Sequence, residues 1–169
     1  MACDDSDRYE CSTITDPETI RLMEIQPSSK LEAPIQCKLR DKNLAQIDYD
    51  IFAHYIALSH VWGDGVDRCA ISVVGKAFDI TATLDSALRH IRDPDRVINV
   101  WADGVCVNQN DIDERNTQVG LMGSIYSMAH HTIIFLGDST PEIGIAMTAI
   151  TRSSGPDISA STNGEQDDT

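Results

Sequence analysis

The chain has 169 residues, of which 41% are hydrophobic and 24% are charged, and its formal net charge is −14 at pH 7. This length supports one compact domain with a hydrophobic core and is too short for two. Because the excess of carboxylates repels phosphate backbones and anionic lipids, and because the 13 Lys and Arg residues are scattered singly, we expect neither nucleic-acid binding nor membrane-surface binding.

The cysteines and the apolar stretches indicate the compartment. The five cysteines include no CxxC pair, which argues against a disulfide framework or a zinc knuckle and favours a reducing environment. Every apolar run is shorter than the roughly 18 residues of a membrane span. The acidic start MACDDSDRYECS also lacks the basic and apolar regions of a secretory signal. We therefore expect a cytoplasmic protein without a membrane span.

Both ends of the chain differ in composition from its middle. Residues 1–18 are acidic with few large apolar side chains, and residues 151–169 form a polar tail. Segments of this composition bury too little apolar surface to offset the entropy of ordering. We expect both ends to be flexible and the folded domain to span residues 19–150.

Short apolar runs open the folded range. IRLMEI (20–25) and IQCKL (35–39) are predicted to form an N-terminal pair of strands. YIALSHVW (55–62) is a nearly continuous apolar run, which is typical of a strand covered on both faces. The runs AISVV and AFDI flank Gly75-Lys76, which indicates a small hairpin.

Helical patterns then alternate with strands. An apolar stripe predicts a helix capped by Thr81 or Thr83; the stripe consists of Leu84, Ala87, Leu88 and Ile91. A strand over 97–102, a helix over 111–129 and a strand over 132–137 follow. This alternation predicts an α/β fold with a mostly parallel sheet, flanking helices and right-handed crossovers.

Polar groups gather where these strands end. Ligands of open parallel sheets bind outside the carboxyl ends of the strands, and the polar stretches 59–64, 103–110 and 137–138 fall there. Trp62 either covers the core or offers a stacking platform beside a ligand. The positions are those of a binding site, although position alone does not identify one.

The helix that begins near Asp111 carries a carboxylate, Glu114, in its first turn. The spacing of Asp111 and Glu114 is that of a capping box, in which each side chain accepts a hydrogen bond from a free backbone N–H. The alternative is a functional carboxylate, because the helix dipole and the free N–H groups keep it ionised and suit it to a positive charge or a ribose hydroxyl. Arg115 either pairs with an anion or lies exposed.

The same helix has apolar residues on two faces, formed by Val119, Met122, Tyr126 and Ala129 and by Leu121, Ile125 and Met128. Gly120 and Gly123 weaken it by about 1 kcal/mol each relative to Ala. Close packing against a neighbouring element would explain these glycines. The alternative is that one face is a surface for self-association.

Other chemistries are disfavoured. A nucleophile–base arrangement of Ser59, His60 and Cys106 is disfavoured. Ser59 and His60 are neighbours in a predicted strand and therefore point to opposite faces, and Cys106 is typical of a small buried residue rather than a thiolate. His130-His131 lacks metal-ligand spacing, so we expect no metal. The glycine patterns of phosphate-binding and dinucleotide-binding loops, and the calcium-loop spacing, do not occur.

Long stretches of the chain nevertheless match a known family. YIALSHVWGD (55–64), ITATLDSALRHIR (80–92) and VWADGVCVNQNDIDERNTQVGLMGSIYSMAHHTIIFLGD (100–138), preceded by IRLMEI, follow one another in a fixed order. The chain resembles the fungal heterokaryon-incompatibility (HET) domain over about residues 19–150. It departs from the usual family wording at His60, where Tyr is common, and at Ala102-Asp103-Gly104, where Ile-Asp-Ala is common.

The resemblance implies a cytoplasmic fungal module that takes part in nonself recognition and triggers growth arrest and programmed cell death. Its implied partner is a second copy of itself or another incompatibility protein, and members of the family usually carry further regions after this domain. The family is also similar to Toll/interleukin-1-receptor (TIR) domains. That similarity implies a flavodoxin-like parallel sheet, here with an extra N-terminal strand pair and a small hairpin.

Some TIR domains cleave NAD with a glutamate at the start of the helix after the third strand, and Glu114 falls at that place. The resemblance therefore implies an NAD hydrolase without a permanently bound cofactor, in which the ionised Glu114 stabilises a ribosyl cation in an open pocket. The residues implied to bind NAD are Ser59, Trp62, Gly63, Asp64, Asp103, Asn108 and Arg115. The alternative is a signalling module without catalysis that acts by self-association.

Overall fold

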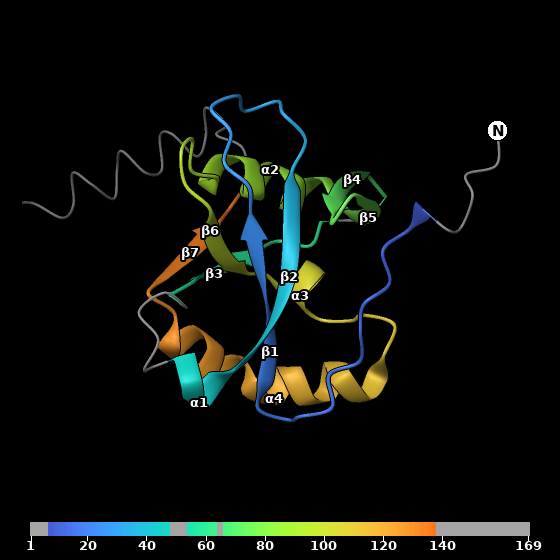
Figure 1. Ribbon diagram of the computed structural model, residues 1–169, viewed down its shortest axis with the longest axis vertical. Helices are drawn as coiled ribbons and strands as arrows, with labels where there is room; N and C mark the ends of the chain where they lie inside the picture. Colours follow the sequence, from blue (N-terminus) through green and yellow to red (C-terminus); the bar gives the residue numbers. More distant parts are fainter. Residues whose placement is uncertain (1–6, 48–53, 64–65, 138–169) are drawn as a thin grey trace, which may run out of the picture. The chain divides into compact units, whose positions relative to one another are not determined.

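The computed structural model describes residues 7–47, 54–63 and 66–137, which form one α/β unit (Figure 1). The predictions for Asp64 and for the 151–169 tail concern residues outside the described part. In chain order the elements are β1 (Thr19–Ile25), β2 (Gln36–Asn43), α1 (Leu44–Ile47), β3 (Ile56–His60), β4 (Arg68–Val73), β5 (Lys76–Thr81), α2 (Ala82–Ile91), β6 (Ile98–Trp101), α3 (Asp103–Cys106), α4 (Ile112–Met128) and β7 (His131–Phe135).

The strands form one seven-stranded sheet in the order β5-β4-β2-β1-β6-β3-β7. The pairs β2–β4, β3–β6 and β3–β7 are parallel, whereas β1–β2, β1–β6 and β4–β5 are antiparallel. The expectation of a mostly parallel sheet is therefore corrected to a mixed sheet. The physical reason lies in β1, which is buried at nearly every position and takes a central place in the sheet, where it runs against both neighbours.

Helix α2 forms as its sequence predicts. The side chain of Thr81 accepts a hydrogen bond from the N–H of Leu84 at 3.3 Å and caps the first turn. Leu84, Ala87 and Leu88 are buried, and the helix packs against β3, β4 and β5. The predicted cap and stripe are confirmed, with Ile91 at the partly buried edge of the core.

Helices α2 and α4 lie on opposite sides of the strands (Figure 1). Ile125 of α4 is fully buried, and its carbonyl accepts a hydrogen bond from the Tyr55 hydroxyl. The prediction that Gly120 and Gly123 pack closely against a neighbour is wrong. A Cβ added at either glycine would meet nothing within 4 Å in the described part of the chain, so both lie on an open face of the helix.

The hairpin β4–β5 is confirmed, but its turn is one residue earlier than predicted. Val74 and Gly75 form the turn, with φ angles of +52° and +83°. Two consecutive positive φ angles are the signature of a type I′ turn, whose twist matches that of the flanking strands. Glycine adopts this conformation readily, whereas a β-branched valine does not.

Part of the acidic N-terminus, expected to be flexible, contacts the sheet edge. The N–H of Tyr9 donates to the carbonyl of Ala77 at 2.9 Å, and the Arg8 guanidinium pairs with the Asp79 carboxylate. The Tyr9 ring meets the edge of Phe78 at a centroid distance of 6.2 Å. These contacts hold residues 8 and 9 against β5. None of the described helices is long and apolar enough to cross a bilayer.

Candidate functional site

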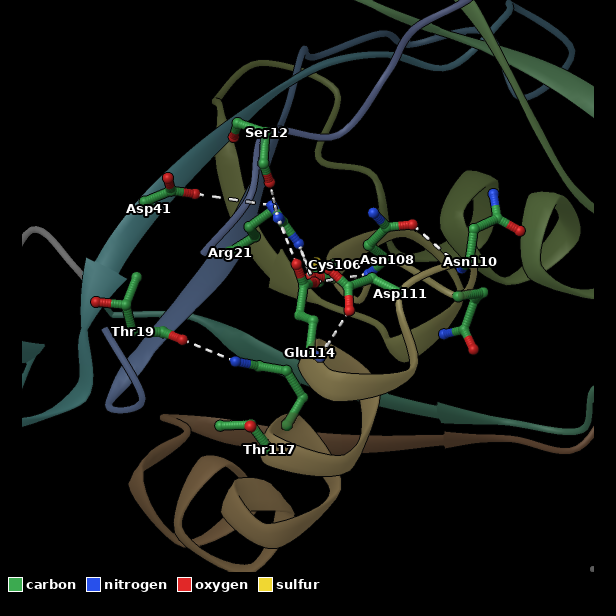
Figure 2. Close-up of polar contacts among 12 residues, drawn as sticks. Ser12, Thr19, Arg21, Asp41, Cys106, Asn108, Asn110, Asp111, Glu114 and Thr117 are labelled. Atoms are coloured by element: carbon green, nitrogen blue, oxygen red, sulfur yellow. Dashed lines mark hydrogen bonds and ion pairs between the residues drawn. The ribbon is translucent and has the colours of Figure 1, made fainter. Parts of the chain in front are cut away.

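A buried ion pair joins the central strand to the start of α4 (Figure 2). Arg21 of β1 is fully buried, and its guanidinium donates to both carboxylate oxygens of Glu114, with Nη2 and Oε2 2.9 Å apart. Further Arg21 donors reach the carbonyls of Ser12 and Cys106. A buried guanidinium needs several acceptors to replace water. These contacts supply them to the two terminal nitrogens, whereas Nε has no hydrogen-bond partner in the described part of the chain and lies 3.8 Å from the Asp41 carboxylate.

Glu114 is occupied on its other side by the main chain. Its Oε1 accepts a hydrogen bond from the N–H of Asn108 at 2.8 Å, and its side chain is 3% exposed. Asp111 caps α4, because its Oδ1 accepts from the N–H groups of Asp113 and Glu114 at 3.1 Å. The capping box is thus half formed: Asp111 caps the helix, while Glu114 turns towards Asn108 and Arg21 (Figure 2).

These contacts keep Glu114 ionised. Burial acts to raise the pKa of the Glu114 carboxyl, but the hydrogen bonds from Arg21 and Asn108 outweigh it and hold the pKa below its ordinary value. An ionised carboxylate was expected here on the basis of the helix dipole. The structure adds a stronger cause, since the largest stabilising contact comes from a strand that lies 93 residues away in sequence.

A cavity of about 850 Å³ opens near the carboxyl end of β3. Its walls come from the N-terminal segment, from β5 and from the loop between α3 and α4. Its lining residues are Arg8, Tyr9, Glu10, Cys11, His60, Trp62, Arg68, Ala77, Phe78, Asp79, Ile80, Thr81, Leu84, Gly104, Val107, Asn108, Gln109 and Asn110. Glu114 is not in this lining, so the structure does not place its carboxylate in the open pocket implied by the resemblance.

His60, Trp62 and Asp103 form a compact group at this cavity. The Trp62 indole Nε1 donates to Asp103 Oδ2 at 3.1 Å, and the indole stacks on the His60 ring with centroids 5.9 Å apart and planes 24° apart. His60 Nδ1 lies 3.7 Å from Asp103 Oδ1. Burial lowers the pKa of His60, and the Asp103 carboxylate only partly offsets this. Burial therefore favours the neutral imidazole.

The structure brings together only some of the residues that sequence reasoning assigned to a pocket. Trp62 and Asn108 line the cavity, and Asp103 holds Trp62 from behind. The backbone of Gly63 has φ +68°, and a Cβ there would lie 3.4 Å from Thr83 Oγ1. The positive φ of Gly63 thus allows the chain to turn directly after Trp62.

Other predicted residues lie elsewhere. Ser59 faces α4, where it hydrogen-bonds with the side chain of Tyr126, which confirms that Ser59 and His60 point to opposite faces of β3. Arg115 lies exposed on α4. The roles implied for all these residues, including catalysis by Glu114, stay predictions.

The alternative chemistries find no support in the geometry. Cys106 is fully buried, and burial raises the pKa of its thiol to about 12, so it is not a thiolate at neutral pH. The described residues contain no group of His, Cys, Asp or Glu side chains that would hold a metal ion. His130 and His131 instead contact each other edge to face.

Sequence reasoning missed Arg21 and undervalued His60. A signal for Arg21 was present, since a charged residue inside the apolar run IRLMEI has to find a partner if the strand is buried. The identity of that partner depends on the antiparallel insertion of β1, which no local pattern reveals. His60 was considered only as a base for Ser59, which lies on the opposite face.

Comparisons with known proteins give the family. Residues 55–169 match the family described as Heterokaryon incompatibility protein (HET). The chain is 33% identical over 156 residues to Heterokaryon incompatibility protein 6, OR allele, of Neurospora crassa, an alignment that covers 84% of this chain and 22% of that protein. No solved structure matches the chain. The chain therefore belongs to the heterokaryon incompatibility family.

Proposed function

We propose that this chain triggers growth arrest and programmed cell death on nonself recognition, and that it acts by associating with a second copy of itself or with another incompatibility protein. The family supports the role in fungal incompatibility. The route through association is carried by one observation, the open face of α4. Because the chain corresponds to 22% of the length of its Neurospora relative, the activity of a whole protein is part of this proposal.

The open face of α4 has the composition of a contact surface. Ile112 and Val119, which are 62% and 59% exposed, are seven residues apart and so lie on one side of the helix. Gly120 and Gly123 leave the backbone bare beside them, with nothing within 4 Å of an added Cβ in the described part of the chain. Exposed apolar side chains grouped in this way are typical of interaction sites, and the bare backbone allows a partner to approach closely.

Two measurements test this proposal. Sedimentation of the purified chain at increasing concentration gives its association constant, and induced expression in a compatible fungal strain gives the surviving fraction of cells. Val119→Lys should weaken association about tenfold or more, because it places a charge in an apolar contact, and should restore survival. Val74→Lys is the matched control, since Val74 is 65% exposed on the distant hairpin. Unchanged killing by Val119→Lys would exclude this face.

A second candidate function is cleavage of NAD, which the cavity at the carboxyl end of β3 favours. The N–H of Asn108, a cavity residue, binds the ionised Glu114, so the carboxylate lies directly behind the cavity wall. To meet a ribosyl cation, it would have to leave Arg21. Nicotinamide release from NAD by the concentrated protein tests this function. Glu114→Gln should abolish release if the carboxylate acts, and full activity in that variant would remove Glu114 from the reaction.

A further inference from the structure

One buried polar side chain at the cavity, that of His60, has no hydrogen-bond partner among the described residues. The side chain of His60 is 1% exposed, and neither ring nitrogen has a hydrogen-bond partner in the described part of the chain. Nδ1 lies 3.7 Å from the Asp103 carboxylate, which favours the tautomer with the proton on Nδ1. The other nitrogen, Nε2, then presents a lone pair. A buried acceptor without a donor costs free energy that a bound donor recovers.

The edge of the ring that carries Nε2 faces the backbone of Gly104. A Cβ at Gly104 would lie 3.9 Å from His60 Nε2 and 3.8 Å from Cε1, and it would press against Leu84 Cδ2 at 2.8 Å. His60, Leu84 and Gly104 all line the cavity. Leu84 already packs close to this position, so a side chain at Gly104 would clash with Leu84 and crowd the edge of the His60 ring.

Trp62 covers the His60 ring on the cavity side. Its indole is 46% exposed, stacks on the imidazole and is held by its hydrogen bond to Asp103. The Nε2 lone pair lies in the plane of the imidazole, so a ligand in the cavity meets it at the edge of the ring, beside the half-exposed indole that lines the same cavity. An aromatic wall beside a few fixed polar groups is the usual composition of a small-molecule site.

The charges of the lining balance, although the chain as a whole has a net charge of −14. The lining holds two cations, Arg8 and Arg68, and two carboxylates, Glu10 and Asp79. Arg8 pairs with the carboxylate of Asp79, and Arg68 donates a hydrogen bond to the backbone carbonyl of Asp79 at 2.9 Å. The remaining polar lining is largely neutral and includes the amides Asn108, Gln109 and Asn110. A site of this kind favours a neutral ligand with several hydrogen-bonding groups over an anion.

We propose that this cavity binds a neutral ring that carries hydroxyl groups, either a free sugar or the sugar of a nucleoside. One hydroxyl donates a hydrogen bond to His60 Nε2, the ring lies against Trp62, and the amides of the loop between α3 and α4 bind further hydroxyls. This site requires neither catalysis by Glu114 nor association through α4. It is therefore tested separately from association through α4, whereas a preference of the cavity for neutral ligands would count against NAD, which carries two phosphates, as the ligand of the same cavity.

Nuclear magnetic resonance of the ¹⁵N-labelled 169-residue chain tests the site with glucose, adenosine and adenosine monophosphate as probes. Glucose or adenosine should shift the His60 ring nitrogens and the Trp62 indole N–H, and the tighter of the two identifies the source of the sugar. Adenosine monophosphate should bind no more tightly than adenosine. No shift with glucose or adenosine would overturn the proposal, and so would a clear preference for the charged nucleotide.

Two variants test the assigned contact. His60→Phe keeps an aromatic ring under Trp62 but removes Nε2, and should weaken binding of the responsive probe roughly two- to tenfold, the usual effect of one hydrogen bond between neutral groups. His90→Phe, on the exposed side of α2, is the matched control and should bind normally. If His60→Phe folds and binds as tightly as the parent, the assignment of Nε2 is wrong. Should it fail to fold, the His60 shifts in the parent protein still decide.

Discussion

Replacing Glu114 with Ala is expected to destabilise the fold severely, whatever its effect on function. The substitution removes the carboxylate that accepts hydrogen bonds from both terminal nitrogens of Arg21 and from the N–H of Asn108. It leaves the guanidinium in place, and that side chain is fully buried. The cost is therefore dominated by an unpaired buried cation rather than by a lost surface contact.

The size of the effect follows from this burial. Breaking a buried ion pair by removing one partner typically costs about 3–5 kcal/mol. Arg21 keeps the carbonyls of Ser12 and Cys106 and lies 3.8 Å from the half-exposed Asp41 carboxylate. These groups partly solvate the cation, so we expect about 3 kcal/mol. Since domains of this size are stable by about 5–15 kcal/mol, Glu114→Ala should remain folded in water but unfold at much lower urea concentration.

Urea unfolding followed by circular dichroism measures this loss, and the double variant Arg21→Met with Glu114→Leu separates its causes. Replacing both partners by apolar side chains removes the stranded charge, so the double variant should be clearly more stable than Glu114→Ala. Arg115→Ala, at the neighbouring exposed position, should be nearly neutral. A change below about 0.5 kcal/mol in Glu114→Ala, the range of ordinary surface substitutions, would refute this account of the ion pair.

Three further predictions concern other parts of the chain. Val74→Asn should raise the free energy of unfolding by about 1 kcal/mol, because Asn tolerates the positive φ of a type I′ turn better than Val; an unchanged urea midpoint would contradict this. The pKa of His60 in the folded protein lies below its ordinary value of 6.5. The contribution of the neutral His60 to the free energy of unfolding should therefore be complete above pH 6.5 and should be lost as the pH falls through the pKa of the folded state. His60→Phe should remove that part of the acid sensitivity, as measured by urea midpoints across the pH range. Cys106, with a pKa of about 12, should resist a thiol reagent at neutral pH, whereas the partly exposed Cys69 should react, as counted by mass spectrometry.

The elements of this fold were predictable where a local pattern decides them. The cap at Thr81 and the stripe that follows it fix α2, and the largely apolar runs fix β3, β6 and β7, because period and capping act over neighbouring residues. The order of strands was not predictable in the same way. Residues 20–25 read as the start of a separate strand pair, yet β1 lies between β2 and β6. Strand order depends on contacts between residues far apart in sequence, and alternation of elements does not report it.

The site shows the same division at finer scale. The strand end at Asp103 and Asn108 was recognised, because polar residues after a buried strand have few structural explanations. The direction in which each side chain points was less accessible. The sequence around Glu114 fits both a residue of a capping box and an ionised functional carboxylate. Only the position of Arg21, which lies 93 residues away in sequence, shows what the Glu114 carboxylate contacts. For Trp62 the sequence left two alternatives, a cover of the core and a stacking platform beside a ligand. The indole stacks on His60 and is half exposed, so it combines features of both.

The buried ion pair also explains why so many charged and polar residues follow β6. β1 brings Arg21 into the sheet beneath the loop that precedes α4, and a buried cation there requires an anion on the facing element. Glu114 supplies this anion, and its carboxylate also accepts a hydrogen bond from the N–H of Asn108 in the loop. The cap of α4 is formed by Asp111, which accepts a hydrogen bond from the N–H of Glu114. Much of this stretch therefore joins α4 to the central strand. The other side of the stretch faces the cavity, which Asn108, Gln109 and Asn110 line together with Trp62. Variants that test a role of the cavity therefore have to change cavity side chains and leave the Arg21–Glu114 pair intact.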